Sequence, residues 1–265
     1  MRRTVALLGA CHPGPALAVT VLAGLLAAAV GLGPGRIALV VVAVLAGQLS
    51  IGWSNDLVDL ARDRAVGRTD KPLVDGRASE RTVRIACGVA LVATVPLSLA
   101  CGLLAGLVHL VCVAAGWAYN LGVKATPWSW VPYAVAFGGL PAFVSLTAEP
   151  DQLPPLWMSL AGALLGVGAH VVNVLPDLAD DAATGVRGLP HRLGAQWSPV
   201  VAAAVLVAAA VVIVVGAPVT GVVAVVALVA TAGLAAVALL ARGRTPFRAA
   251  IAMALVDVAM LVWAR

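Results

Sequence analysis

Long apolar runs separated by short polar stretches dominate the chain. A membrane-spanning helix needs about 17–25 predominantly apolar residues. Nine runs of about this length can be read, at approximately 14–32, 36–54, 83–100, 103–119, 128–147, 154–174, 197–215, 218–241 and 247–264. The pattern predicts an all-α, polytopic membrane protein with nine transmembrane helices, and a single membrane domain over residues 1–265.

Composition agrees with this class of protein. Hydrophobic residues make up 62% of the chain and charged residues only 11%, whereas soluble domains have about 25% charged residues. Membrane lipids must therefore solvate most of the surface. If the N-terminus is cytoplasmic, 15 of the 17 Lys and Arg residues fall on inner segments, as the positive-inside rule requires. We expect an integral protein of the cell membrane with this orientation, and no nucleic-acid partner, because the basic charge reflects topology.

Nine of the 12 acidic residues lie in two inner segments, 55–82 and 173–196. Each segment begins at the inner end of a predicted span, the second and the sixth. At 100° per residue, the acidic residues within the first nine positions of each segment share one helical face. These positions, with the Asn that opens the first set, are Asn55, Asp56, Asp59 and Asp63, and then Asp177, Asp180 and Asp181.

Such faces need a compensating cation, because like charges three or four residues apart repel and burial near a membrane adds a desolvation cost. Carboxylates without Cys or His suit hard cations, and Mg²⁺ is typically held by a few carboxylates together with substrate phosphates. Two matching faces favour a metal site over a solvated, salt-bridged surface. We predict that these seven residues bind Mg²⁺. Nearby cations could contact a diphosphate: Arg62, Arg64, Arg68, Lys71 and Lys124.

These motifs resemble the UbiA superfamily of intramembrane prenyltransferases. The first family motif, N-D-x-x-D-x-x-x-D, is matched from Asn55 to Asp63, and the second, D-x-x-x-D, by Asp177 and Asp181. Further matches are Arg68-Thr69, Lys71-Pro72-Leu73, Tyr119-Asn120 with Lys124, Gly185 and Arg192-Leu193-Gly194. Val186 and Gly188 stand where many relatives have Lys and Thr, which leaves Arg187 as the basic residue of that turn. His191 is also unexpected there.

The resemblance implies that the nine transmembrane helices surround a central cavity. It implies a Mg²⁺-dependent prenyltransferase that moves an isoprenoid group from a prenyl diphosphate to a lipophilic acceptor, commonly aromatic, within the membrane. It implies catalytic roles for Asp59 and Asp177, diphosphate binding by Arg187, and shielding of a carbocation by Tyr119, which could equally be an interfacial anchor. A terpene cyclase with the same metal site remains an alternative. A transporter is disfavoured because its ion site would lie near the bilayer midplane.

Two histidines and one aspartate fall inside predicted spans. His109 and His170 are expected to be neutral and hydrogen-bonded, although intramembrane ionisable residues are functional candidates. His170 shares the face of Asp177 two turns deeper and is the better candidate. Asp257 is expected to hydrogen-bond to a neighbouring helix.

Overall fold

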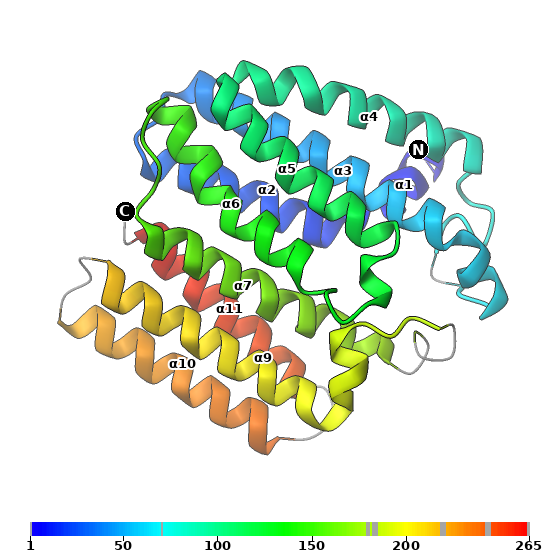
Figure 1. Cartoon of the computed structure of the whole chain (residues 1–265). Helices are drawn as coiled ribbons and strands as arrows, with labels where there is room; N and C mark the ends of the chain where they lie inside the picture. The colour runs from blue at the N-terminus through cyan, green and yellow to red at the C-terminus, as the bar shows by residue number, and fades with distance from the viewer. Residues whose placement is uncertain are drawn as a thin grey trace. The chain divides into compact units, whose positions relative to one another are not determined.

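The computed structural model describes residues 2–69, 71–178, 181, 185–217, 221–241 and 245–263. Within these ranges the secondary structure is helical and contains no strand (Figure 1). The chain divides into two compact units, one formed by residues 1–121 and 143–151, and the other by residues 122–142 and 152–265. We refer to them as unit 1 and unit 2 and describe each by itself.

Unit 1 is built around the long helix α3. It contains α1 (Arg2–Gly9), α2 (Pro13–Ala29), α3 (Pro34–Ala65), α4 (Glu80–Ala100), α5 (Leu103–Asn120) and the last part of α6 (Val131–Ala148). Helix α3 packs against α2, α4 and α5. Proline stands at the start of both α2 and α3, where its missing N–H costs no hydrogen bond.

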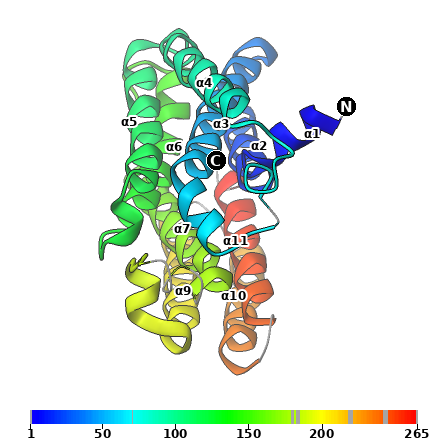
Figure 2. The same ribbon diagram turned by 90° about the vertical axis from the view of Figure 1, so that its right-hand side faces the viewer.

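Unit 2 contains a bundle of four longer helices. Its elements are the 3₁₀ turn η1 (Val123–Ala125), the first part of α6, α7 (Leu156–Val174), the 3₁₀ turn η2 (Leu175–Asp177), α9 (Leu189–Gly216), α10 (Val222–Leu240) and α11 (Thr245–Trp263). Helices α9, α10 and α11 pack against one another, and α7 packs against α9 and α11 (Figures 1 and 2). Helices α7 and α9 approach closely at Gly168, where the absence of a side chain leaves room for Leu206. A Cβ at Gly168 would lie 2.6 Å from the Leu206 side chain.

The helices confirm the predicted fold class. Among the described residues, eight helices are long and apolar enough to cross a membrane, and the apolar helix α2 is shorter, with 17 residues. The nine predicted runs each correspond to one of these helices, but a count of nine spans is not established. Many large apolar side chains on α4 and α10 are exposed, including Val92 at 72% and Val229 at 66%. In a membrane protein such faces meet lipid.

Three local features go beyond the predicted apolar spans. Helix α3 continues 11 residues past the end of the span at 54 and carries the whole first motif, as the helical spacing of that motif predicted. Helix α9 starts eight residues earlier than predicted and contains a kink at Gly194, whose φ of 77° lies in the left-handed region. Helix α1 precedes the first apolar run and was not predicted.

Candidate active site

The first acidic motif forms a buried patch on the last turns of α3. Asp56, Asp59 and Asp63 are 2%, 6% and 5% exposed. All three and Asn55 lie within α3, which agrees with the prediction of one continuous helical face. Burying charged groups is costly unless they are paired, so their partners decide what this patch can do.

Lys71 is the cation at the centre of this patch. It comes from the connection between α3 and α4, and its Nζ atom forms an ion pair with Oδ1 of Asp56. The same Nζ lies 3.8 Å from Oδ2 of Asp63. Lys71 therefore balances two carboxylates of the motif and joins the α3–α4 connection to α3. Lys71 was predicted to bind the diphosphate, and the structure shows it beside the predicted metal ligands Asp56 and Asp63.

His12 is a part of this site that sequence reasoning missed. Its Nε2 atom lies 2.9 Å from Oδ1 of Asp56 and 3.1 Å from Nζ of Lys71. His12 precedes α2 in a left-handed conformation, with φ 54° and ψ 64°, which is uncommon for a residue other than glycine. Its separation of 44 residues from Asp56 left no local signal.

Gly52 allows the chain around His12 to approach α3. A Cβ at Gly52 would lie 2.0 Å from the carbonyl oxygen of Cys11. Nearby, the indole Nε1 of Trp53 donates a hydrogen bond of 2.9 Å to the carbonyl oxygen of Leu7. Gly52 and Asp56 are four residues apart and share a helical face. The close approach at Gly52 thus places His12 against Asp56.

The other predicted residues of unit 1 have distinct surroundings. Arg62 forms a 3.0 Å ion pair with Asp59, while Arg64 is exposed and Arg68 is partly buried. The amide nitrogen of Asn55 donates to Oδ1 of Asn120, at 3.1 Å. Tyr119, the neighbour of Asn120, is partly buried near the end of α5. The structure therefore brings Arg62 and Lys71 to the motif.

The second motif lies in unit 2, where the structure describes only part of it. Asp177 ends η2, but its side chain, like Asp180, lies outside the described residues. Oδ2 of Asp181 is 3.4 Å from Nε2 of His191. Lys124 is buried in η1, with 9% exposure, whereas Arg187 is exposed.

Both intramembrane histidines are hydrogen-bonded, as predicted. Nδ1 of His109 lies 2.7 Å from the Ser98 hydroxyl in unit 1. Nε2 of His170 lies 2.9 Å from the Ser129 hydroxyl in unit 2. Asp257 is fully buried, but neither carboxylate oxygen has a hydrogen-bond partner among the described residues. The interhelical hydrogen bond expected for Asp257 is therefore not observed.

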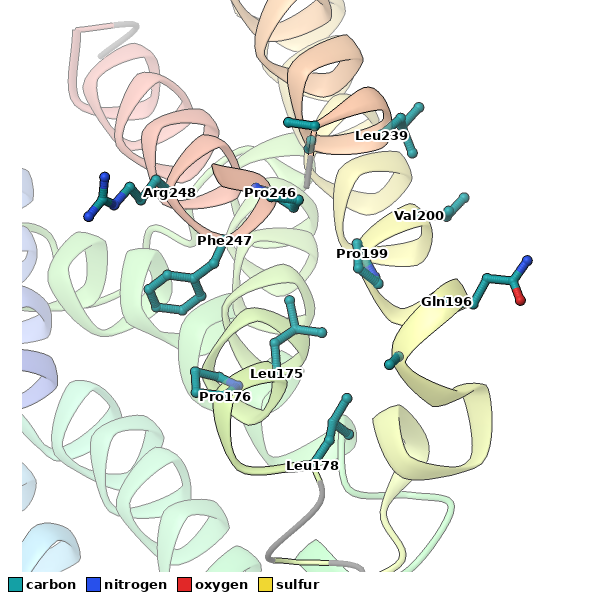
Figure 3. Close-up of a pocket in the computed structure, with 13 residues that line it drawn as sticks. Leu175, Pro176, Leu178, Gln196, Pro199, Val200, Leu239, Pro246, Phe247 and Arg248 are labelled. Atoms are coloured by element: carbon teal, nitrogen blue, oxygen red, sulfur yellow. The ribbon is translucent and has the colours of Figure 1, made fainter. Parts of the chain in front are cut away.

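A pocket of about 770 Å³ also lies in unit 2 (Figure 3). Leu175, Pro176 and Leu178 line it from the chain around the second motif, and residues of α9, α10 and α11 complete it. The lining is mainly apolar, and Arg248 is its charged member among the described residues. The described lining contains no carboxylate and no residue of α3.

The donor set of the first motif suits a hard divalent cation. Among the described residues, no three His, Cys, Asp or Glu side chains are already arranged as a metal site. However, Oδ2 of Asp56 is buried and has no hydrogen-bond partner in the described part of the chain. Oδ1 can stay with Lys71 while Oδ2 binds a cation. Oxygen ligands of this kind are those that Mg²⁺ prefers.

Fold and site together define an all-helical membrane protein with an acidic, oxygen-rich patch on one helix end. The chain belongs to the UbiA prenyltransferase family, whose model matches residues 17–263. This confirms the resemblance seen in the motifs, and it supports the prediction of a prenyltransferase at the level of the family.

Individual relatives agree with this assignment. A digeranylgeranylglyceryl phosphate synthase of Methanothrix thermoacetophila is 31% identical over 168 residues, which are 58% of this chain and 57% of that protein. The alignment thus spans little more than half the length of this curated relative.

Two solved structures share the fold. A UbiA homologue from Archaeoglobus fulgidus, bound to GPP and Mg²⁺, has a TM-score of 0.73 and 15% identity, with 98% of this chain and 99% of that chain covered. A structure of digeranylgeranylglyceryl phosphate synthase has a TM-score of 0.72 and 16% identity, with 100% and 99% covered. At these identities the likeness concerns the fold.

Proposed function

We propose that this protein catalyses the Mg²⁺-dependent transfer of an isoprenyl group from a prenyl diphosphate to a lipophilic acceptor within the membrane. The observation that carries the proposal is the buried patch of Asp56, Asp59 and Asp63 on α3, in a chain of the UbiA prenyltransferase family. A buried acidic patch with one unpartnered oxygen attracts a divalent cation, and the cation in turn attracts a diphosphate.

The proposed reaction breaks one bond and forms another. The bond between the allylic carbon and the diphosphate oxygen breaks, and its electron pair leaves with the diphosphate. A nucleophilic atom of the acceptor then bonds to the allylic carbon and loses its proton. Mg²⁺, when bound, supplies charge stabilisation for the departing diphosphate.

We assign the residues of the chain to three tasks. Asn55, Asp59, Asp63 and Oδ2 of Asp56 would hold metal together with Asp177, Asp180 and Asp181. The cations would bind diphosphate oxygens through charge-assisted hydrogen bonds: Arg62, Arg64, Arg68, Lys71, Lys124 and Arg187. Tyr119 would face the allylic cation.

The test uses purified protein in detergent with GPP and Mg²⁺. Product mass and released diphosphate are measured with a phenolic acceptor, with a geranylgeranylated glyceryl phosphate, and with no acceptor. The lipid acceptor is included because of the name of the curated relative. We expect a prenylated product with one acceptor and at least a hundredfold loss in Asp59→Asn, because transition-state charge stabilisation is lost. A cyclic hydrocarbon formed without acceptor would identify a cyclase instead, and the absence of any diphosphate release would refute the proposal.

We also propose that the first motif faces the cytoplasm and that the protein resides in the cell membrane. The distribution of basic residues supports this orientation. A single cysteine placed at exposed Arg77 in a variant lacking the four native cysteines tests it. Labelling of intact cells by an impermeant thiol reagent would contradict the orientation, and labelling only after lysis would support it.

A further inference from the structure

A buried serine–histidine pair in unit 2 joins two stretches of chain that carry predicted site residues. Ser129 is 0% exposed and His170 is 1% exposed. The Ser129 hydroxyl lies 2.9 Å from Nε2 of His170 and accepts a 2.8 Å hydrogen bond from the backbone N–H of Leu189. The pair therefore connects α7, the chain just before α6, and the start of α9.

The turn held at Leu189 comes directly after the second acidic motif. The N–H of Val186 donates to the carbonyl oxygen of Asp181, at 2.9 Å, and the Asp181 side chain lies 3.4 Å from His191. Residues 186–189 are thus held by two backbone N–H groups, with Val186 bonded to Asp181 and Leu189 bonded to Ser129. Anything that holds Leu189 also limits where Asp181 can lie.

Lys124 lies on the other side of the same contact. A Cβ at Gly188 would lie 2.6 Å from the carbonyl oxygen of Lys124 and 2.8 Å from the Ser129 hydroxyl. The absence of a side chain at Gly188 therefore lets the turn press against the backbone of Lys124. Lys124 is predicted to bind the diphosphate and Asp181 is predicted to bind the metal. The contact at Gly188 holds the chain segments that carry these two residues against each other.

We propose that Ser129 and His170 are positioning residues, which fix the turn after the second acidic motif against Lys124 so that Lys124 and Asp181 can engage one diphosphate–metal group. Neither side chain contacts the substrate in this role, since the Ser129 hydroxyl is already bonded to His170 and Leu189. The inference rests on the proposed function for its catalytic consequence, but the anchoring of the turn can be measured without any substrate.

The natural control is a second buried serine–histidine pair in unit 1. Ser98 and His109 are joined by a 2.7 Å hydrogen bond and are 0% and 3% exposed. The Ser98 hydroxyl donates to the carbonyl oxygen of Thr94 in α4 and bonds to His109 of α5, so its recorded partners lie in helices and not in a loop. Ser98→Ala therefore removes the same kind of hydrogen bond without touching the turn, and it reports the purely structural cost.

The first measurement is hydrogen–deuterium exchange of the 185–190 peptide in the ligand-free protein. Ser129→Ala is expected to raise exchange at the Leu189 amide at least tenfold, because this N–H loses its acceptor, and Ser98→Ala is expected to leave it unchanged. Equal exchange in Ser129→Ala and wild type would overturn the anchoring. If Ser129→Ala does not fold, Gly188→Ala gives the same test, because the added Cβ pushes the turn away from Lys124.

The second measurement is steady-state prenyl transfer with GPP as a function of Mg²⁺. Substitutions of residues that orient metal ligands typically cost about 10–100-fold in metal affinity or activity, so Ser129→Ala should raise KM for GPP and the half-activating Mg²⁺ concentration about tenfold. His170→Gln, which keeps a hydrogen-bonding group toward Ser129, should recover most of the loss seen in His170→Leu. Identical kinetics for Ser129→Ala and Ser98→Ala would overturn the positioning role. A wild type without transfer activity would instead refute the proposed function and leave the exchange result to judge the anchoring.

Discussion

Gly52→Ala tests whether the close approach of the Cys11–His12 corner to α3 builds the acidic site. The added Cβ would lie 2.0 Å from the carbonyl oxygen of Cys11, whereas carbon–oxygen contacts lie at about 3.3 Å or more. The corner would therefore have to move by roughly 1.3 Å relative to α3. The Cβ position is fixed by the backbone of residue 52 and the oxygen belongs to the backbone of Cys11, so no side-chain rotation can relieve the overlap.

The expected cost follows from the contacts at this corner. Overpacking costs about 1–3 kcal/mol. The hydrogen bonds of Trp53 to Leu7 and of His12 to Asp56 add roughly 1 kcal/mol or more each. Replacing a helical glycine by alanine stabilises the helix by about 1 kcal/mol, which offsets part of this cost. We therefore expect a net destabilisation of about 2–4 kcal/mol, together with weaker Mg²⁺ activation because His12 no longer supports Asp56.

Unfolding by SDS in mixed micelles measures this difference. Gly88→Ala is the matched control, because Gly88 is also inside a helix of unit 1 and a Cβ there meets nothing within 4 Å. The control should be as stable as wild type or slightly more stable. If Gly52→Ala matches the control in both stability and Mg²⁺ activation, the corner does not support the site and the reasoning is wrong.

Three further outcomes are expected. Lys71→Met should lower the free energy of unfolding by about 3–5 kcal/mol, because a buried carboxylate loses its cation. Adding Asp56→Asn to Lys71→Met should recover part of this loss. Strictly additive effects of the two substitutions in SDS unfolding would contradict the ion pair. Lys124→Ala should raise KM for GPP about tenfold, which corresponds to one charge-assisted hydrogen bond of roughly 1.5 kcal/mol. The control Arg81→Ala, at an exposed position, should leave KM unchanged. Equal kinetics in the two variants would show that Lys124 does not bind the diphosphate. EDTA should abolish transfer and added Mg²⁺ should restore it, so that turnover persisting in EDTA would exclude a metal-dependent reaction.

The sequence predicted the helices well because apolar runs report directly on burial in lipid. It predicted the shared face of the first motif because the period of an α-helix fixes which residues are neighbours. Hydropathy ended the second span at 54, whereas the spacing of the motif predicted helix up to Asp63, and α3 keeps its polar last turns to Ala65. These turns stay helical while Leu60 and Trp53 pack into a core with residues of α1 and α4.

Contacts between distant residues had no sequence signal. His12 reaches Asp56 only because its backbone is left-handed and Gly52 leaves room, neither of which a residue pattern encodes. Ser129 is similar, since it is an unremarkable serine in a Trp-Ser-Trp stretch whose role depends on a backbone N–H 60 residues away. The hydrogen bonding of His170 could be expected in kind, because a buried imidazole needs a partner, but its partner could not be named.

The length of α3 has a consequence for how the two reaction products would separate. Its 32 residues span about 48 Å at 1.5 Å per residue, against a hydrocarbon thickness of about 30 Å. The turns that carry Asp56, Asp59 and Asp63 therefore extend to the level of the lipid headgroups or beyond. In the proposed reaction, a diphosphate released there would enter water directly, while the prenylated product would stay dissolved in the bilayer. With each product in its own phase, the reverse reaction would require the two to meet again at this boundary, and dilution alone would favour the forward direction.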